Sequence, residues 1–96
     1  MILHIINKAP DQSASLSRCL DCLAPDDSLV LIEDGVYLLT WPPAKIESLA
    51  KTNIYYLQSD LKARGLADLT AQTATPIDYS ELVELVCSHS KSVSWF

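Results

Sequence analysis

The chain has 96 residues, of which 49% are hydrophobic and 20% are charged, and its formal net charge is −5. This length suits a single domain over residues 1–96, and this composition excludes a disordered chain. The lysines and arginines are scattered, so no basic stripe is available to bind nucleic acid or an anionic membrane surface. The first residues do not have the charged leader and apolar run typical of a signal peptide, and no apolar run approaches the roughly 20 residues that a membrane span needs, so we expect neither. We therefore expect a cytoplasmic protein with reduced cysteines.

Short apolar runs bounded by turn residues predict strands over residues 2–6, 28–33 and 53–58, and a short edge strand at 75–78. Apolar residues three and four apart predict helices over residues 12–23, 43–51 and 79–88, with shorter helical segments at 36–40 and before Gly65. Asp11 or Ser13 is expected to cap the first helix, and Ser59 or Asp60 the helix before Gly65. Alternating strands and helices predict an α/β fold, with a mainly parallel sheet of four to five strands covered by helices on both faces.

The last helix and the tail carry many apolar side chains for so small a chain. Tyr79, Leu82, Val83 and Val86 share one face of the predicted helix 79–88. The chain then closes on two large aromatic residues, Trp95-Phe96. We expect this tail to pack onto the domain or onto a neighbouring subunit, since aromatic residues are enriched at interfaces. A partner subunit is one way to cover the surplus apolar surface.

Two of the three cysteines form the motif Cys19-Leu20-Asp21-Cys22. The pair lies toward the C-terminal end of the predicted helix, whereas a dithiol redox pair uses a helix N-terminus to stabilise its thiolate. At about 100° per residue, Cys19 lies about 60° from Leu16, on the rim of the apolar face, and Cys22 lies closer to solvent. Cys87 on the last helix is expected to behave as a small hydrophobic residue.

The sequence offers little support for a metal site, a nucleophilic catalytic site or a phosphate-binding loop. Cys19, Cys22, Cys87 and His89 could supply four zinc ligands, but Cys-x-His is not a usual half-site spacing, so we expect no metal and no cofactor. His4 is expected to make a hydrogen bond within the fold, and His89 to cap the last helix. Glu33 and Asp34 end a strand, where α/β proteins bind ligands, although Asp34-Gly35 is also ordinary turn chemistry. There is no nucleophile elbow and no glycine-rich phosphate loop.

Several stretches occur in a particular order along the chain. They are Asn7-Lys8-Ala9-Pro10, then Glu33-Asp34-Gly35-Val36-Tyr37, Asp60-Leu61-Lys62-Ala63-Arg64-Gly65-Leu66, Ile77-Asp78-Tyr79, and a tryptophan at the extreme end. Together, and over essentially the full length, they resemble the TusB/DsrH family, whose members are small subunits of the sulfur-relay complexes TusBCD and DsrEFH. The resemblance implies a DsrE/DsrF-like three-layer sandwich with a parallel sheet between helices.

The resemblance also implies a function and a set of partners. It implies a heterohexamer with TusC/DsrF-like and TusD/DsrE-like subunits, which takes persulfide sulfur from a TusA-like donor and passes it to a TusE-like acceptor. In TusBCD the sulfur ends in 2-thiouridine at the wobble position of tRNA, and in DsrEFH the relay serves sulfur oxidation. We take the tRNA pathway as the main expectation, with a mainly structural, interface-forming role for this chain.

Cys19 falls where DsrH-type members carry a cysteine, a few residues after the Asn-Lys-x-Pro turn. The resemblance thus implies that Cys19 is an accessory persulfide acceptor, although some TusB members lack this cysteine, and Cys22 has no counterpart. Two alternatives stay open. In one, this is a DsrH-type subunit of a sulfur-oxidation relay with Cys19 as obligatory carrier. In the other, it is a stand-alone regulatory or ligand-binding module that uses the Glu33-Asp34-Gly35 strand end.

Overall fold

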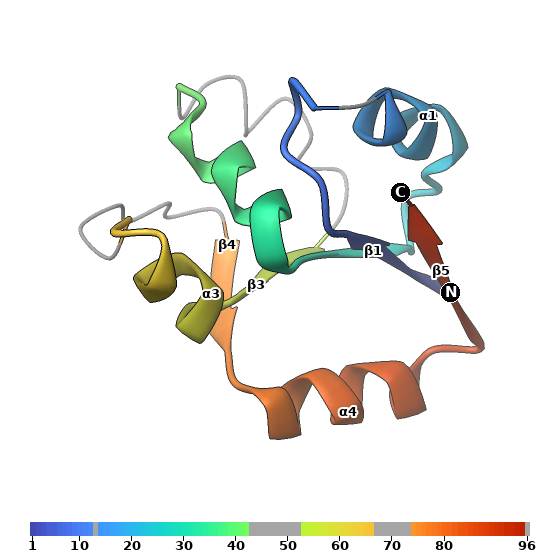
Figure 1. The fold of residues 1–96 in the computed structure, drawn as a ribbon. Helices are drawn as coiled ribbons and strands as arrows, with labels where there is room; N and C mark the ends of the chain where they lie inside the picture. Colours follow the sequence, from blue (N-terminus) through green and yellow to red (C-terminus); the bar gives the residue numbers. More distant parts are fainter. Residues whose placement is uncertain (13, 43–52, 67–73, 96) are drawn as a thin grey trace.

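The computed structural model describes residues 1–12, 14–42, 53–66 and 74–95. Its helices and strands alternate along the chain, as the apolar periodicity predicts (Figure 1). The strands are β1 (Ile2–Ile6), β2 (Ser28–Leu31), β3 (Asn53–Leu57), β4 (Ala74–Ile77) and β5 (Lys91–Trp95). The helices are α1 (Ser15–Cys22), the 3₁₀ helix η1 (Glu33–Thr40), α3 (Gln58–Ala63) and α4 (Tyr79–Ser88). The expected helix over residues 43–51 lies outside the described residues.

All five strands pair in parallel in one sheet, in the order β4-β3-β2-β1-β5. The expectation of a mainly parallel sheet of four to five strands is therefore confirmed. β2 is the central strand and is buried at every position, which explains its run of consecutive aliphatic residues. β4 lies at one edge of the sheet, the position at which a strand tolerates a proline such as Pro76. β5 forms the other edge, and the sequence analysis did not predict it as a strand.

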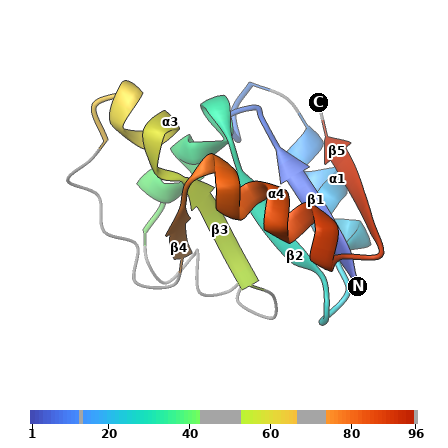
Figure 2. The same cartoon turned by 90° about the horizontal axis from the view of Figure 1, so that it is seen from below.

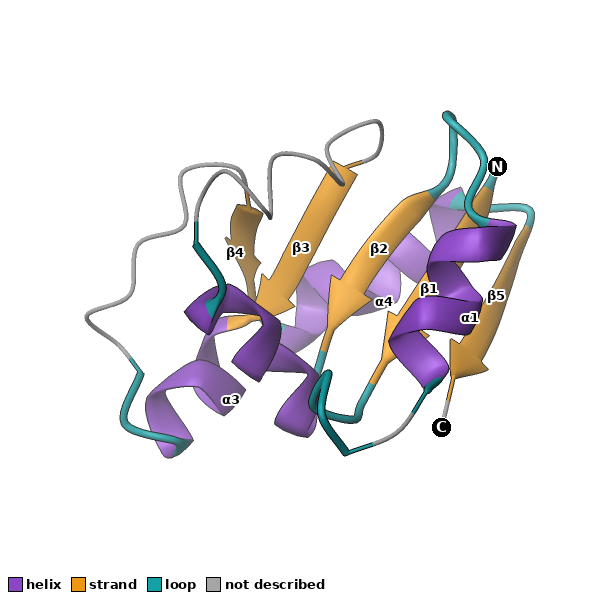
Figure 3. Ribbon diagram, turned by 90° about the horizontal axis from the view of Figure 1, so that it is seen from above, coloured by secondary structure: helices purple, strands orange, loops and turns teal. Residues whose placement is uncertain are grey.

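Helices cover both faces of the sheet (Figures 1 and 2). α1, η1 and α3 lie on one face, and Figure 3 views the molecule from their side. The larger apolar core fills the space between these helices and the sheet, with Leu16, Leu29, Leu31, Val36 and Leu61 among its buried members. α4 lies on the opposite face over a smaller core, formed by Leu3, Val30, Leu57 and Ile77. No helix within the described ranges is long and apolar enough to cross a membrane.

The helix termini differ from expectation in two places. α1 begins at Ser15 after Ala14 with no side-chain cap, so the cap expected from Asp11 is wrong, while Ser13 lies outside the described residues. α3 begins at Gln58 after Leu57, so the cap expected from Ser59 or Asp60 is wrong; both lie inside the helix, and Asp60 accepts a hydrogen bond from the N–H of Glu33. Gly65 follows α3 in the left-handed conformation with φ 68°, as predicted.

A capping box begins α4. Asp78 Oδ1 accepts a hydrogen bond from the N–H of Glu81 at 2.8 Å, and the N–H of Asp78 donates to Glu81 Oε1 at 3.2 Å. The spacing of an acceptor residue and a glutamate three positions on is the signature of this motif. It explains why α4 begins where the sequence analysis placed it, at Tyr79.

Candidate functional site

The segments that follow β1, β2 and β3 come together at one edge of the sheet. The three strands are neighbours and run parallel, so their carboxyl ends share this edge. Three of the sequence stretches singled out above fall here: residues 7–10, 33–37 and 60–66. In open α/β sheets this edge is where ligands bind, particularly between neighbouring strand ends.

Asp34 connects the three segments through its side chain. Its Oδ1 accepts a hydrogen bond from Nε of Arg64 at 2.9 Å, and its Oδ2 accepts one from Nε2 of Gln12 at 3.3 Å. Gln12 in turn accepts, at Oε1, a hydrogen bond from the N–H of Ala9 at 2.9 Å. The hydrogen bond from Arg64 holds the pKa of Asp34 below its ordinary value, so this carboxylate stays ionised at neutral pH.

The backbone after β2 is unusual and is held from two sides. Glu33 has φ 49°, in the left-handed region that side chains rarely adopt, and its N–H donates a hydrogen bond to Asp60 Oδ2 at 2.7 Å. At the next turn Gly35 lies against β1, where an added Cβ would overlap the carbonyl oxygen of Ile6. The Glu33-Asp34-Gly35 stretch therefore needs both its glycine and a carboxylate from α3.

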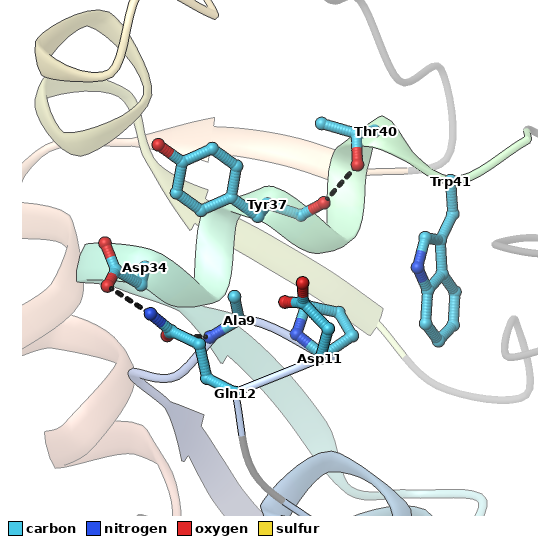
Figure 4. A pocket seen from close by; sticks show the side chains of 8 residues that line it. Ala9, Asp11, Gln12, Asp34, Tyr37, Thr40 and Trp41 are labelled. Carbon is cyan, nitrogen blue, oxygen red and sulfur yellow. Dashed lines mark hydrogen bonds between the residues drawn. The ribbon is translucent and has the colours of Figure 1, made fainter.

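A surface hollow of about 580 Å³ lies beside Asp34. Figure 4 shows Gln12 and Asp34 joined on one side of it, with Tyr37 and Thr40 on η1 and Trp41 directly after that helix. Thr40 Oγ1 donates a hydrogen bond to the carbonyl oxygen of Tyr37 at 2.7 Å, which fixes that end of η1. The remaining lining residues are Ala9, Pro10 and Asp11.

The lining of this hollow suits recognition rather than covalent chemistry. Its described residues offer carboxylates, an amide and aromatic rings, but no cysteine or histidine. Across the described part of the chain, no group of three or more His, Cys, Asp or Glu residues is placed to hold a metal ion. The hollow can contact a ligand or a protein segment by charge and by aromatic packing.

Cys19 lies away from this hollow, in the core between α1 and the sheet. It is 0% exposed and belongs to the same apolar cluster as Leu16, with Leu20 and Trp95 packed against that cluster. The expectation that it lies on the rim of the apolar face is therefore wrong. Burial, with smaller contributions from Cys22 and Asp27, raises the pKa of the Cys19 thiol to about 12. In this conformation the thiol is protonated and out of reach of a partner.

The other two cysteines are exposed. Cys22 faces solvent at the end of α1, as expected from its position on the helix. Cys87 was expected to behave as a small hydrophobic residue, and it is exposed on α4. The thiols of Cys22 and Cys87 are therefore accessible to solvent, whereas the thiol of Cys19 is not.

A chain of polar contacts joins β5, β1 and the residue before β2. Trp95 Nε1 donates to His4 Nδ1 at 3.1 Å, and His4 Nε2 lies 2.8 Å from Asp27 Oδ2. Because the indole nitrogen can only donate, Nδ1 must accept, and Nε2 must carry the proton that is donated to Asp27. Burial alone would raise the pKa of Asp27, but the hydrogen bonds from His4 and from the backbone N–H groups of Ala24 and Ile2 outweigh it and lower the pKa to about 2. The expected hydrogen bond of His4 is thus confirmed.

His89 joins the end of α4 to the start of β2. Its Nδ1 lies 2.6 Å from the carbonyl oxygen of Leu85 and donates to it, and its Nε2 is hydrogen-bonded to Ser28 Oγ at 2.9 Å. The expected capping role of His89 is confirmed. Its partner Ser28 is buried, which makes the pair a structural connection between two elements.

Comparisons with known proteins agree with one another. The family model described as "DsrH like protein" matches residues 8–92. Protein TusB of Shigella sonnei (strain Ss046) is 34% identical over 96 residues, covering 98% of this chain and 100% of that protein. Proteins TusB of Escherichia coli O1:K1 / APEC and of Erwinia tasmaniensis are 33% and 32% identical, with the same coverage. The chain belongs to the DsrH family.

The solved structure of the ychN protein from E. coli shares the fold of this DsrH-family chain. It superposes with a TM-score of 0.79 over 97% of each chain, at 19% sequence identity. The expected α/β architecture is thereby confirmed.

The geometry also explains the sequence features that resemble the DsrH family. Asp34, Gly35, Asp60 and Arg64 all build the carboxyl edge of the sheet, through the ion pair, the close approach to β1 and the support of Glu33. Four of the residues that carry the resemblance therefore shape this edge of the sheet. Sequence reasoning missed the partnership of Asp34 with Arg64, for which the only signal was that both follow neighbouring parallel strands.

Proposed function

We propose that this chain is a subunit of a sulfur-relay complex that delivers persulfide sulfur toward 2-thiolation of the tRNA wobble uridine in the cytoplasm. Its membership of the DsrH family, together with full-length similarity to proteins named TusB, carries this proposal. Residues 1–96 act as one domain within a heterohexamer, alongside TusC/DsrF-like and TusD/DsrE-like subunits. A TusA-like donor and a TusE-like acceptor exchange sulfur with that complex.

A structural, interface-forming role fits the chemistry of the chain. Its carboxyl-edge hollow offers charge and aromatic surface, with no thiol and no imidazole among the described lining residues. The one cysteine at the position implied by the family is sealed in the core with a raised thiol pKa. Its net charge of −5 suits contact with proteins better than direct contact with tRNA.

An accessory sulfur-accepting role for Cys19 remains a prediction. It requires the apolar core to open so that the Cys19 thiol reaches solvent. The thiol would first lose its proton to solvent. The thiolate would then attack the outer sulfur of a donor persulfide, forming a new S–S bond on Cys19 and releasing the donor as a thiolate. Exposing Cys19 requires α1 to separate from the sheet, at the expense of the contacts around Leu16.

The test is the 2-thiouridine content of tRNA in cells that lack this chain. We expect 2-thiouridine to fall strongly on deletion and to return when wild-type chain is supplied. Supplying the Cys19→Ala variant should restore it as well, because the proposed role is structural. Unchanged 2-thiouridine after deletion would show that the proposed pathway is wrong, and failure of Cys19→Ala alone would make Cys19 an obligatory carrier. Circular dichroism of the purified variant separates such a failure from misfolding.

A further inference from the structure

The two faces of the sheet are covered unequally. α1, η1 and α3 lie on one face, whereas α4 is the only described helix on the other, and most of β3 lies clear of α4 in Figure 2. α4 packs on the small core through Leu82 and Leu85, while Tyr79, Val83 and Val86 are exposed. A parallel sheet is ordinarily covered on both faces, so the β3–β4 part of this face is a candidate for cover by another molecule.

Side-chain exposure shows where the cover by α4 ends. Leu57 and Ile77, at the ends of β3 and β4 nearest the start of α4, are 1% and 4% exposed. Tyr55 and Thr75 are register partners two residues earlier in the same strands, and they are half-buried and exposed, respectively. Because alternate residues of a strand share a face, all four side chains lie on the α4 side of the sheet. This face therefore opens to solvent between α4 and the edge strand β4.

A groove of about 300 Å³ lies along this opening. The strands line it with Tyr55, Thr75 and Ile77, and α4 lines it with Glu81, Glu84, Leu85 and Ser88. No lysine or arginine is among the described lining residues. Glu81 Oε1 accepts the hydrogen bond of the capping box, whereas no hydrogen bond or ion pair within the described residues engages Glu84. The groove thus combines a negative wall on α4 with a partly apolar floor on the sheet.

Charge complementarity selects the kind of occupant. Glu81 and Glu84 are three residues apart on one helix and line the same groove, so a single positive side chain can lie beside both. Covering the exposed Glu84 without a positive partner would leave a desolvated, unpaired charge. A lysine or arginine also has an apolar stem, which suits contact with Tyr55 and Leu85.

A second copy of this chain is a poor occupant of the groove. A two-fold contact through the groove would bring Glu81 and Glu84 of both copies into the same interface, and each copy carries a net charge of −5. Like charges at an interface suppress association. The complementary occupant is a different chain.

We infer that this groove binds a segment of a different subunit, which covers Tyr55 and Thr75 and places a lysine or arginine side chain beside Glu81 and Glu84. The segment lies next to α4 and covers the part of the sheet that α4 leaves open. The inference rests on the proposed function, because it takes the partner to be another chain of the relay complex.

Labelling of carboxylates reads the groove directly. The isolated chain and its complex with the co-expressed TusC- and TusD-like chains are treated with a carbodiimide and glycine ethyl ester, and each modified residue is followed by peptide mass spectrometry. We expect Glu84 to react at least about fivefold more slowly in the complex, because the occupant separates it from solvent. Asp21, an exposed carboxylate on α1 across the sheet, should react at an unchanged rate.

Substitutions test the same groove without a label. Glu84→Lys should weaken assembly at least about tenfold, since it places two positive charges together. The loss should be smaller at high salt, which screens this repulsion. Thr75→Trp should also weaken assembly, because the large ring fills the groove. Asp21→Lys and Ser92→Trp make the same changes at exposed positions of α1 and of the other edge strand, and both should assemble as wild type.

Circular dichroism establishes that each variant is folded, and each outcome then decides the inference. Slower labelling of Glu84 in the complex together with weaker assembly of Glu84→Lys supports it. Equal labelling of Glu84 in both samples, equal slowing of Glu84 and Asp21, or normal assembly of Glu84→Lys overturns it and leaves the proposed function standing. Protection of Glu84 that grows with the concentration of the isolated chain makes the occupant a second copy, which also overturns it. If wild-type chain does not assemble with these subunits at all, the inference and the heterohexamer fall together.

Discussion

The indole N–H of Trp95 donates a hydrogen bond of 3.1 Å to Nδ1 of His4, a residue 91 positions earlier in the chain. The two rings also stack, with centroids 6.1 Å apart and an interplanar angle of 22°. Their strands, β5 and β1, are paired in parallel, so this contact fastens the last strand to the first. The expectation that the aromatic tail packs onto the domain is confirmed for Trp95, while Phe96 lies outside the described residues.

Trp95→Phe should destabilise the fold by about 1 kcal/mol, because it keeps an aromatic ring but leaves Nδ1 of His4 without its donor. Urea unfolding followed by circular dichroism at pH 7 measures the change in free energy. Tyr79→Phe is the matched control: it also removes a polar atom from an aromatic ring, but at an exposed position, and should change stability by less than about 0.5 kcal/mol. Equal effects of the two substitutions would contradict a stabilising contribution from the part-buried hydrogen bond of Trp95.

Asp27 should make stability depend on pH in the acid range. Its pKa is lowered from 3.8 to about 2 in the folded protein, so its contribution is present above pH 4 and is lost as the pH falls toward 2. The lowering corresponds to about 2 kcal/mol. In Asp27→Asn the free energy of unfolding should therefore fall less steeply between pH 4 and pH 2 than in wild type, and it should be lower at pH 7.

The neighbouring Asp26 supplies the control for this prediction. Its side chain is 70% exposed, and it pairs only with the N-terminal amine, at 3.6 Å, among the ion pairs of the described residues. Asp26→Asn should leave the acid limb of the stability curve close to wild type. If both variants keep the wild-type slope, the hydrogen bonds to Asp27 do not set the acid dependence.

The three cysteines should differ sharply in reactivity. At pH 8 in the native isolated chain, iodoacetamide should alkylate Cys22 and Cys87 readily and leave Cys19 essentially unmodified, since the Cys19 thiol is buried with a pKa of about 12. In urea all three should react. Peptide mass spectrometry reads each site separately. Native labelling of Cys19 at the rate of Cys22 would mean that the core around α1 opens readily, and it would favour Cys19 as a sulfur acceptor.

The two glycines should respond differently to alanine. Gly35→Ala should cost about 3 kcal/mol or more, because the added Cβ would overlap the carbonyl oxygen of Ile6 and separate η1 from β1. Gly65→Ala should cost only about 1 kcal/mol, since it meets open space and is opposed by its φ of 68° alone. Urea unfolding compares them directly. A smaller loss at Gly35 than at Gly65 would contradict the close approach described for the strand end.

Sequence reasoning predicted most of the sheet for a physical reason. A central parallel strand is covered on both faces, so β2 appears as an unbroken aliphatic run, and β1 and β3 are nearly as apolar. β5 lacks this signal, because Lys91, Ser92 and Ser94 are exposed on an edge strand that pairs only with β1. Its assignment depends on a partner at the other end of the chain, which local periodicity cannot reveal.

The candidate site was harder to predict for related reasons. A helical projection places Cys19 beside the apolar face of α1, but it contains no information about Trp95, which packs against the same apolar cluster from the other end of the chain. The same projection grouped Tyr79, Val83 and Val86 with Leu82 on one face of the helix, but a projection does not show what covers that face. In the described chain only Leu82 and Leu85 of α4 pack on the sheet.

The central claim is that this chain works as one subunit of a multi-subunit relay complex. Native mass spectrometry of the chain co-expressed with its TusC- and TusD-like neighbours tests it most directly. We predict a heterohexamer that contains two copies of each of the three chains. A monomer that ignores both partners would contradict the account.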